Sequence, residues 1–329
     1  MDISVVIPFL NEEPNLQPLC EELRDALAPT DKTYELVFVD DGSTDNGVEL
    51  LEKLRQDIPQ IRIVSLRRNF GQTAAMAAGL DFASGDVVVT IDADRQNDPA
   101  DIPAMVAKLD EGYDLICGWR HKRQDAAIMR KLPSKIANWL IAKTTGVVLH
   151  DYGCTLKAMT STIAKKITLY GEMHRFIPAV ASAIGVKIAE VKVNHRARVA
   201  GESKYGISRT FRVILDLVTV KFLLRYSSRP IHFFGMPGLV LTSVGGLGLS
   251  YLVLGKLLFG MSIADRPLLM LSILLLILGV QFVLFGLIGE MQTRIYHESQ
   301  DKPVYYVRET MGWSDTELPK SESNSDTKV

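Results

Sequence analysis

The sequence predicts an α/β protein: a mixed, mostly parallel β-sheet with helices on both faces, followed by a transmembrane hairpin of two helices. Three observations predict this fold. Short runs rich in Val and Ile alternate with helix-like segments over the first 117 residues. Two amphipathic, basic segments come next, and two long uncharged stretches follow them. A chain of 329 residues can hold one sizeable α/β domain and such an appendage.

Regular alternation of apolar strand-like runs with helical patterns places the first part of the chain in a parallel sheet. The expected strands cover residues 3–9, 35–39, 61–66, 86–91 and 114–117. The expected helices cover residues 15–28, 46–56, 73–82 and 99–110. Because parallel strands are joined by crossover helices, we expect helices on both faces of the sheet.

Two later segments, residues 134–145 and 208–225, combine basic and aromatic residues with helical apolar spacing. Such helices either cover a sheet or lie in the plane of a membrane interface. Both alternatives stay open for residues 134–145. The second segment runs almost directly into an uncharged stretch, so we predict that residues 208–229 form an interfacial amphipathic helix.

Residues 233–254 and 267–289 carry no charge, and each stretch is long enough to cross the hydrocarbon core as a helix. Neither shows a polar face, which disfavours a pair of buried core helices. Basic residues are more frequent outside this hairpin than in its connection, so we predict an inner-membrane protein with both termini cytoplasmic. The flanking residues are Arg225, Arg229, His232, Arg294, Lys302 and Arg308, and the connection holds Lys256, Asp265 and Arg266.

Composition sets further bounds. The net charge of −1 and the lack of a basic run give no reason to expect nucleic-acid binding. Three scattered cysteines predict reduced thiols in a cytosol-facing domain, and we expect no signal peptide before the first strand. The predicted organisation is a catalytic domain (1–207), the interfacial helix (208–229), the hairpin (230–290) and a cytoplasmic tail (291–329) with a disordered end. Gly245, Gly246 and Gly248 permit close helix contact, so the spans could support a homo-oligomer.

Acidic residues follow three of the expected strands. Asp92 and Asp94 come after the run that ends at Ile91, Asp40 and Asp41 follow the second strand, and Glu12 and Glu13 follow the first. In an open α/β sheet, ligands bind at the carboxyl ends of strands, and carboxylate oxygens suit Mg²⁺ or Mn²⁺. Asp41 can accept a hydrogen bond from a pyrimidine N3–H, and Asp92 is placed to reach a ribose hydroxyl. Turn chemistry explains each acidic end singly, but is a poor account of all of them.

The sequences IPFLNEE, VDDGSTD, RNFGQTAAMAAGLDFASGD and DADRQNDP resemble the successive motifs of family 2 glycosyltransferases with the GT-A fold. The chain is most similar to the polyisoprenyl-phosphate glycosyltransferases, the group that includes dolichol-phosphate mannose synthases and bactoprenol glucosyltransferases. Gly118-Trp119-Arg120, Asp151-Tyr152-Gly153-Cys154 and Gly201-Glu202-Ser203-Lys204-Tyr205-Gly206 support this subgroup. The resemblance runs from residue 3 to about 210 and extends to the hairpin.

The resemblance implies a role for each matching residue. The implied nucleotide-binding residues are Pro8, Glu12, Asp41 and Asp92, and the implied metal ligands for Mg²⁺ or Mn²⁺ are Asp92, Asp94 and Gln96. Arg120, Arg130 and Ser134 would bind the acceptor phosphate, and Arg198, Ser203 and Lys204 would close over the phosphates. Arg95 departs from the family pattern, and its effect beside the metal is open. Asp151 has three possible roles: orienting a sugar hydroxyl, which we rank first, acting as a base, or capping a turn.

The implied reaction is an inverting transfer of a sugar from a nucleoside diphosphate to the phosphate of a long isoprenoid lipid, undecaprenyl phosphate in bacteria. The acceptor oxygen is already anionic, so the main tasks are charge stabilisation and alignment, in which Arg120, Arg130 and Lys204 would act. Each cation would contribute on the order of 2–4 kcal/mol. The stretch Asn69-Phe70-Gly71-Gln72 favours glucose from UDP-glucose.

Three alternatives remain for the reaction. A dolichol-phosphate mannose synthase would use GDP-mannose in the same chemistry. A processive polysaccharide synthase would carry a Gln-x-x-Arg-Trp signature and more spans, both of which this sequence lacks. A non-catalytic membrane scaffold would have no need of Asp92 and Asp94, which this chain has kept.

Overall fold

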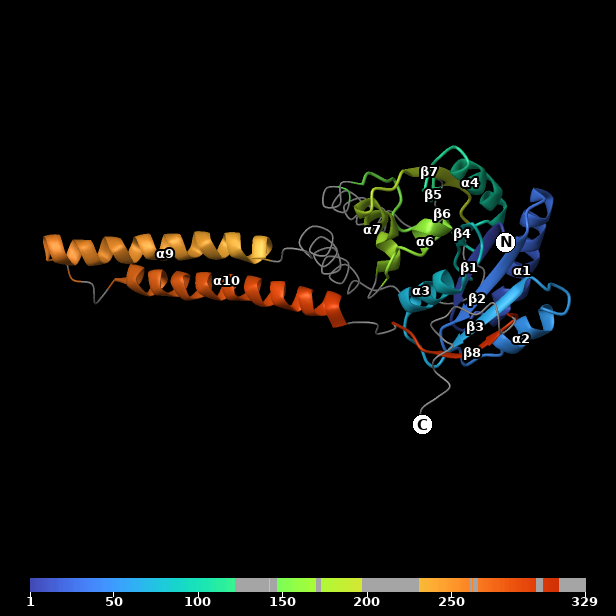
Figure 1. Cartoon of the computed structure of the whole chain (residues 1–329), viewed down its shortest axis with the longest axis horizontal. Helices are drawn as coiled ribbons and strands as arrows, with labels where there is room; N and C mark the ends of the chain where they lie inside the picture. The colour runs from blue at the N-terminus through green and yellow to red at the C-terminus, as the bar shows by residue number, and fades with distance from the viewer. Residues whose placement is uncertain are drawn as a thin grey trace. The chain divides into compact units, whose positions relative to one another are not determined.

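The structure, a computed structural model, describes residues 1–121, 142, 147–169, 173–196, 231–260, 262, 266–299 and 304–313 (Figure 1). The chain divides into two compact units, a head (Met1–Leu217 with Pro303–Val329) and a hairpin unit (Val218–Lys302). Almost all of the first amphipathic segment, and all of the second, lies outside the described residues. The same holds for the predicted disordered end of the tail.

The head is built on one sheet of eight strands in the order β7-β5-β6-β4-β1-β2-β3-β8. The strands are β1 (Ile3–Phe9), β2 (Tyr34–Asp40), β3 (Ile61–Leu66), β4 (Val87–Thr90), β5 (Leu115–Arg120), β6 (Lys157–Thr160), β7 (Ile188–Val193) and β8 (Val307–Met311). Strands β3, β2, β1 and β4 are mutually parallel, as are β5 and β7. Strand β6 lies antiparallel between β4 and β5, and β8 is antiparallel to β3. The sheet is therefore mixed and mostly parallel, as predicted.

Helices cover both faces of this sheet (Figure 1). The helices of the head are α1 (Glu13–Leu27), α2 (Gly47–Leu54), α3 (Gln72–Phe82), α4 (Ile102–Leu109), α6 (Ser161–Ala164) and α7 (Ile177–Ala183). Three 3₁₀ turns join them: η1 (Ala28–Thr30), η2 (Pro99–Asp101) and η3 (Met173–Phe176). Each of the four expected helices is present, with ends shifted by a few residues, and the last of them begins as η2.

The period-2 alternation of β1 divides the core into two layers. Val5 and Ile7 belong to the apolar cluster shared with α1, α2 and α4, whereas Val6 faces α3. A Cβ atom on Gly79 of α3 would come within 2.1 Å of Val6 Cγ1, so the glycine lets this helix lie close against the sheet. Its neighbours in α3 are mostly alanines, and nine residues of the helix are buried.

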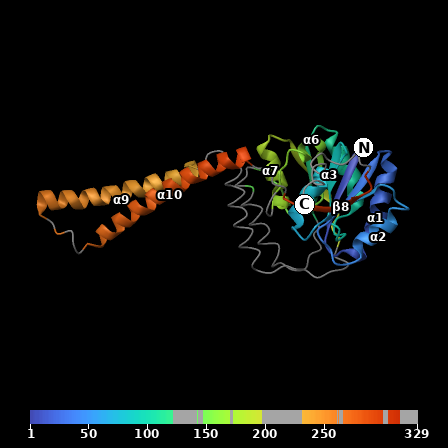
Figure 2. The same ribbon diagram turned by 60° about the horizontal axis from the view of Figure 1, so that its bottom comes forward.

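The strand β8 is the main feature of the head that the sequence analysis missed. It falls in the predicted tail, yet it pairs with β3 (Figure 1), and Figure 2 shows it within the head. Its middle residues are exposed, polar or charged, so the segment lacks the apolar alternation that predicts a strand. A partner strand more than 240 residues upstream leaves no local signal in the sequence.

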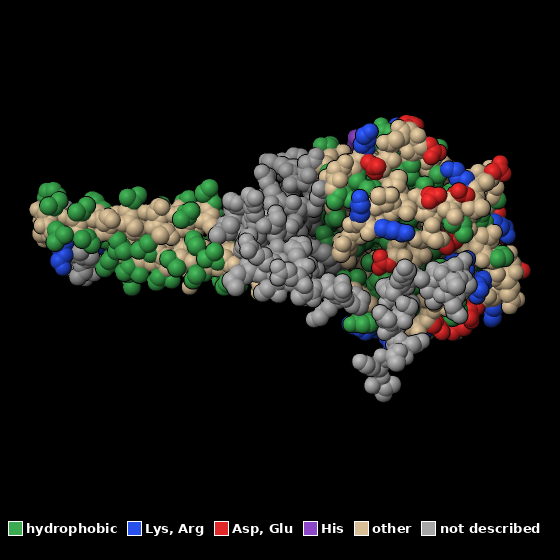
Figure 3. Space-filling model, viewed as in Figure 1, with side chains coloured by type: hydrophobic (Ala, Val, Ile, Leu, Met, Phe, Trp, Pro, Cys, Tyr) green, Lys and Arg blue, Asp and Glu red, His purple; other side chains and the backbone are tan. Residues whose placement is uncertain are grey.

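The hairpin unit contains α9 (Ile231–Phe259) and α10 (Pro267–Ser299). Apolar stretches of 26 and 23 residues within them are long enough to cross a membrane, and few of their residues are buried. Hydrophobic side chains cover the visible face of both helices (Figure 3). A soluble protein rarely exposes such a surface, which agrees with the predicted spans.

Glycines allow the two helices of the hairpin to pack closely against each other. A Cβ atom on Gly245 would lie 2.7 Å from the carbonyl oxygen of Ser272, and one on Gly248 would lie 2.3 Å from the Ser272 hydroxyl. Gly246 meets nothing within 4 Å. Two of the three glycines that we expected to permit oligomer contacts therefore serve the packing of α9 against α10 within one chain.

Candidate active site

The carboxyl ends of β1, β2 and β4 meet at one edge of the sheet. Phe9 of β1 is level with Asp40 of β2, and Val6 of β1 is level with Thr90 of β4. The chain runs outward from β1 through β2 to β3 and then returns to the other side of β1 as β4. Such a reversal of strand order opens a crevice at the carboxyl ends of the strands, where ligands bind in open α/β sheets.

The loops after β1 and β2 are bound to each other at this edge. The backbone N–H of Asn11 donates to the Ser43 hydroxyl at 3.0 Å, and Asn11 Oδ1 accepts from the Thr44 N–H at 2.8 Å. Asn11 has a φ of +56°, a left-handed conformation that asparagine tolerates well. Glu12 lies at the start of α1 and accepts a hydrogen bond from Asn15 at 2.6 Å.

Asp40 and Asp41 have different tasks. Asp40 accepts the N–H of Ser43 and so closes the turn, whereas Asp41 accepts the backbone N–H groups of Phe70 and Gly71 at 2.7 and 3.0 Å. Burial raises the pKa of the Asp41 carboxyl, and the two N–H donors partly oppose that shift. Asp41 is therefore a carboxylate whose position is fixed by the backbone of the segment before α3.

The backbone of the turn after β2 lies very close to the backbone of the segment before α3, and this contact determines the position of Asp41. Gly42 has a φ of +76°, and a Cβ atom there would lie 2.6 Å from the carbonyl carbon of Arg68. Any other residue would clash with the backbone of Arg68 and Asn69. The turn after β2 and the segment before α3 are thus pressed together beside Asp41.

Asp92 follows β4 and is held by side chains. Gln72 Nε2 donates to one of its oxygens and the Thr155 hydroxyl to the other, each at 2.8 Å. Burial, followed by the charge of Asp94, raises the pKa of Asp92 to about 6, while Thr155 and the buried Lys157 act in the opposite direction. An electrostatically crowded carboxylate of this kind gains from a bound cation.

The pair Asp92 and Asp94 fits a hard divalent cation. Asp94 is 8% exposed, and one of its oxygens accepts the N–H of Gln96 at 3.1 Å. In the described parts of the chain, no three acidic, histidine or cysteine side chains gather around one point. The protein therefore offers two carboxylates, which suits Mg²⁺ or Mn²⁺ when substrate phosphates supply further oxygens. The Gln96 side chain stays a predicted ligand.

Arg95 lies between these carboxylates in sequence but is turned away in space. Its backbone has a φ of +58°, and its guanidinium meets Glu22 of α1 at 2.5 Å. Glu22 also binds Arg196 at 2.7 Å, and Arg196 reaches Asp98 at 2.7 Å. The charge of Arg95 is thus balanced by Glu22, so its guanidinium is directed away from the predicted metal ligands Asp92 and Asp94.

Arg120 and Asp151 form a bidentate ion pair at the end of β5. Arg120 Nε lies 2.6 Å from Asp151 Oδ2, and Nη2 lies 2.9 Å from Oδ1. The Gly153 N–H also donates to this carboxylate at 3.0 Å, and Glu190 of β7 accepts the N–H groups of His150 and Asp151. The bond from Gly153 matches the turn-capping alternative for Asp151, and the ion pair with Arg120 adds an orienting role that our three alternatives did not include.

The structure brings together only some of the residues that the resemblance implied. Pro8, Glu12, Asp41, Asp92 and Asp94 lie on the strand ends or loops of this one edge, and Arg120 and Asp151 lie together beside β5. Arg130, Ser134, Arg198, Ser203 and Lys204 lie outside the described residues. Their implied roles stay predictions.

Sequence reasoning missed the residues that hold the predicted ones. Gln72, Thr155 and Glu22 each bind a residue of the candidate site or of its loop. Gln72 stands within a quoted motif, and Thr155 directly follows another, so proximity to a motif was the available signal. Glu22 looks like any exposed helix residue, and only its spatial partners identify it.

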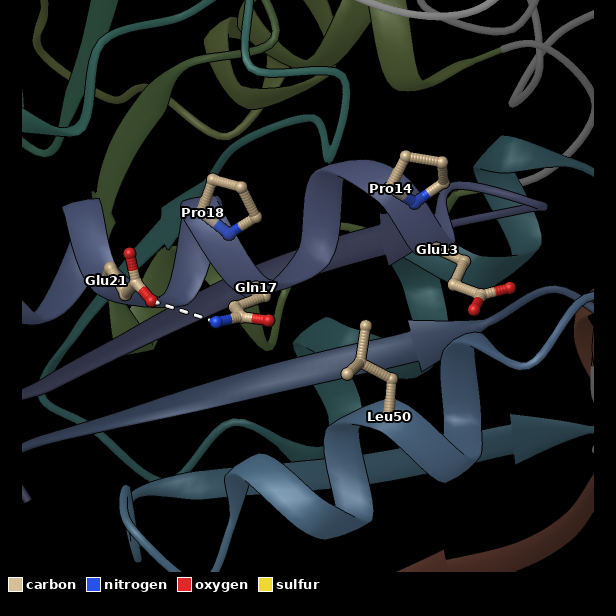
Figure 4. Close-up of a pocket in the computed structure, with 6 residues that line it drawn as sticks. All are labelled: Glu13, Pro14, Gln17, Pro18, Glu21 and Leu50. Carbon is tan, nitrogen blue, oxygen red and sulfur yellow. Dashed lines mark hydrogen bonds between the residues drawn. The ribbon is translucent and has the colours of Figure 1, made fainter.

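A separate groove of about 490 Å³ lies between α1 and α2 (Figure 4). It is lined by Glu13, Pro14, Gln17, Pro18, Glu21 and Leu50, and the side chains of Gln17 and Glu21 are hydrogen-bonded there. None of the predicted site residues lines it. The polar residues that line the groove, Glu13, Gln17 and Glu21, are partly or fully exposed, unlike the buried carboxylates at the strand ends.

Comparison with known proteins identifies the family to which the chain belongs. The chain belongs to glycosyl transferase family 2, whose family model matches residues 4–168 and so includes the carboxyl ends of β1, β2, β4 and β5. This match confirms the resemblance found in the sequence and identifies the chain as a glycosyltransferase.

Individual relatives match most of the chain. A dodecaprenyl-phosphate galacturonate synthase from Rhizobium johnstonii is 47% identical over 313 residues, which cover 94% of this chain and 93% of the relative. An undecaprenyl-phosphate 4-deoxy-4-formamido-L-arabinose transferase from Shewanella sediminis is 38% identical over 312 residues, or 94% of this chain and 92% of the relative. Among solved structures, glucosyl-3-phosphoglycerate synthase from Mycobacterium tuberculosis has a TM-score of 0.49 and 21% identity, over 68% of this chain and 79% of that chain.

Proposed function

We propose that this glycosyltransferase moves a sugar from a nucleoside diphosphate to the phosphate of a polyisoprenyl lipid, with undecaprenyl phosphate as the acceptor. The observation that carries the proposal is the convergence of Asp41, Asp92 and Asp94 at one sheet edge in a chain that also holds an apolar hairpin. The names of the relatives at 47% and 38% identity, both polyisoprenyl-phosphate enzymes, support the acceptor class.

On the donor side, Asp41 would accept the N–H of the base and Asp92 a ribose hydroxyl, with Pro8 and Glu12 lining the nucleoside pocket. Asp92, Asp94 and Gln96 would hold Mg²⁺ or Mn²⁺. Such an ion, when bound, neutralises the diphosphate of the donor and stabilises the charge of the leaving group. Lys204, Arg198 and Ser203 would add hydrogen bonds to the same phosphates.

On the acceptor side, Arg120 would neutralise and align the lipid phosphate, together with Arg130 and Ser134. Asp151 accepts hydrogen bonds from two nitrogens of the Arg120 guanidinium. This pairing fixes the orientation in which the guanidinium can bind a phosphate. A phosphate oxygen is anionic at neutral pH and needs no base, so alignment is the contribution required of these residues. Direct displacement by this oxygen would invert the anomeric centre.

The hairpin would keep the head at the membrane surface, where the acceptor phosphate lies. Strand β8 follows the hairpin and pairs with β3, so both flanks of the hairpin belong to the same folded unit. An even number of spans satisfies this requirement. Together with the basic flanks, this supports a cytoplasmic head and cytoplasmic termini at the inner membrane.

The donor sugar is the finer part of the proposal. The stretch Asn69–Gln72 favours UDP-glucose, and GDP-mannose is the alternative within the same chemistry. A uronate donor is a further candidate, because a relative with 47% identity is named a galacturonate synthase.

The test is transfer of radiolabelled sugar to undecaprenyl phosphate by the full chain in detergent, with Mg²⁺ or Mn²⁺ and with EDTA as the metal-free control. UDP-glucose, UDP-galacturonate and GDP-mannose would be supplied separately. Label that enters the lipid phase from one donor, only with metal, supports the proposal and identifies the sugar. No transfer from any nucleotide sugar in a wider panel would favour a membrane scaffold. Light scattering on the same sample would measure the number of subunits.

A further inference from the structure

We infer that Tyr306, in the segment that follows the hairpin, is a positioning residue for the donor nucleotide site: it holds the loop that orients Asp41 and Asp92. This inference rests on the proposed function, because it takes the strand ends to be a nucleotide site. It assigns a task to a part of the chain that the sequence analysis placed in a tail.

The loop concerned is residues 69–72, which lead from β3 into α3 and include the first residue of that helix. Two of its backbone N–H groups bind Asp41, and the side chain of its last residue, Gln72, binds Asp92. One short segment therefore bridges the carboxylates that follow β2 and β4, on either side of β1. A shift of this loop would move hydrogen-bond partners of both carboxylates at once.

The returning segment contacts this loop directly. The rings of Phe70 and Tyr306 lie 6.1 Å apart at an angle of 43°, within the range of a favourable aromatic pair. The Arg68 guanidinium lies 4.3 Å from the centre of the Phe70 ring. Because Phe70 also donates its N–H to Asp41, the residue that Tyr306 contacts is itself bound to the candidate site.

The backbone fixes Tyr306 in place. Its carbonyl oxygen accepts the N–H of Arg67 at 2.9 Å, and the Arg67 side chain donates to the carbonyl of Val307 at 3.3 Å. The pairing of β3 with β8 shifts register between Ser65 and Leu66, just before this point. Such an irregularity bends the strand, and here it lies where β3 leads into the 69–72 loop.

Further contacts secure the segment at both ends. Before Tyr306, the Tyr305 hydroxyl donates to Asp81 of α3 at 2.8 Å. After β8, the Trp313 ring lies 5.3 Å from Phe82 and within 5.7 Å of the Arg62 guanidinium. The segment is thus anchored on β3 and α3, the elements on either side of the loop, and can act as a fixed support for it.

The experiment compares Tyr306→Ala with Tyr306→Phe in the full chain. Nucleotide binding would be measured by calorimetry with UDP and, separately, GDP in Mn²⁺, and the donor KM by transfer assay. We expect Tyr306→Ala to weaken binding of the nucleotide that wild type prefers by roughly 3- to 10-fold, the scale of a lost aromatic pair. The donor KM should rise in proportion while kcat and the acceptor KM stay within about 2-fold, and Tyr306→Phe should match wild type.

Two control variants separate positioning from general stability. Tyr305→Phe loses the bond to Asp81, and Trp313→Ala loses the contact with Phe82, whereas the aromatic partner of Phe70 is Tyr306. Both should weaken nucleotide binding less than Tyr306→Ala does, whatever their melting temperature. Should Tyr306→Ala not fold, Phe70→Leu tests the same contact from the loop side, with the same expected loss.

The outcomes are distinct. Wild-type affinity in Tyr306→Ala, or equal loss in Tyr306→Ala and Trp313→Ala that follows their stability, overturns the inference and leaves the proposed function standing. If wild type binds neither UDP nor GDP, the strand ends are not a nucleotide site, and both the inference and the proposed function are wrong.

Discussion

Asp41 and Asp92 lie at the same edge of the sheet, on either side of β1, but the protein holds them in different ways. Asp41 is bound by two backbone N–H groups of the 69–72 loop, and the adjacent Gly42 is pressed against the backbone of that segment. Asp92 is bound by two side chains, Gln72 and Thr155, which come from α3 and from the segment before β6.

The two carboxylates therefore depend on different features of the protein. No single side-chain deletion removes the donors of Asp41, so its position depends on the path of the backbone and on what supports that path. The position of Asp92 depends on residue identity at Gln72 and Thr155, and a single substitution can loosen it. The first arrangement suits recognition of a flat base, and the second suits a carboxylate that must share its oxygens with a cation.

The largest effect should come from removing the proposed metal ligands. Asp94→Ala, and Asp92→Asn with its nearly equal volume, should each lower kcat/KM for transfer by at least about 100-fold, the scale of losing one main electrostatic contribution. Asp41→Asn should lower it much less, because an amide oxygen can still accept from the same N–H groups. Transfer assays with titrated Mn²⁺ would measure this.

The exposed Asp110→Asn is the matched control and should leave transfer unchanged. If Asp41→Asn were as damaging as Asp92→Asn, the proposed division between base recognition and metal binding would be wrong.

Asp151 adds a third way of holding a carboxylate, through a guanidinium. Asp151→Asn leaves Arg120 with its charge largely buried, a change that typically costs about 3–5 kcal/mol in such pairs. We expect a lower melting temperature and a fall of roughly 30-fold in kcat/KM for the lipid acceptor, with the donor KM little affected. Calorimetric melting and a pH–rate profile would check this.

The pH–rate profile separates orientation from base catalysis. A positioning role for Asp151 predicts that the profile keeps its shape in Asp151→Asn. If the acidic limb of the pH–rate profile were lost in Asp151→Asn, Asp151 would act as a base.

The sequence predicted the central part of the head because each local signal agreed with the global fold. The strands β1 to β4 are mostly apolar runs, and acidic residues follow closely after β2 and β4, so parallel pairing brings Asp41 and Asp92 to one edge. The hairpin was equally evident, because a stretch of more than 20 uncharged residues has few alternatives.

The rest depends on partners that are distant in sequence. Strand β8 has exposed polar side chains and becomes a strand only because β3 offers an open edge. Arg120 and Asp151 were each singled out, but their ion pair forms only once the end of β5 meets the turn at Asp151. Arg95 shows the same limit, since its sequence position suggests the metal and its left-handed backbone directs it to Glu22.

A smaller effect should follow from loosening Asp92 without removing it. Gln72→Ala and Thr155→Val each delete one hydrogen bond to a charged group, and we expect a fall of about 10-fold in kcat/KM with a higher Mn²⁺ requirement. The corresponding change beside Asp41 is Gly71→Ala, which strains a backbone with a φ of +99° but meets no neighbour. Gly71→Ala should raise the KM for the donor and raise the Mn²⁺ requirement less than Gln72→Ala does. A rise as large as in Gln72→Ala would show that Asp92 depends on the backbone of the loop as much as on the Gln72 side chain.

The smallest effect concerns the protonation of Asp41 and can be isolated with uridine, which lacks phosphates, in EDTA. Burial raises the pKa of Asp41, so this carboxyl takes up a proton at a higher pH than an ordinary aspartate. Only the ionised form offers all its lone pairs to the single N3–H donor of uracil. Uridine binding should therefore weaken by a few-fold as the pH falls from neutrality through the raised pKa of Asp41, and return when the pH is restored. In Asp41→Asn, binding should be weaker at pH 7 and nearly independent of pH, as measured by calorimetry. Equal pH dependence in both proteins would assign the titration to another group and remove Asp41 from base recognition.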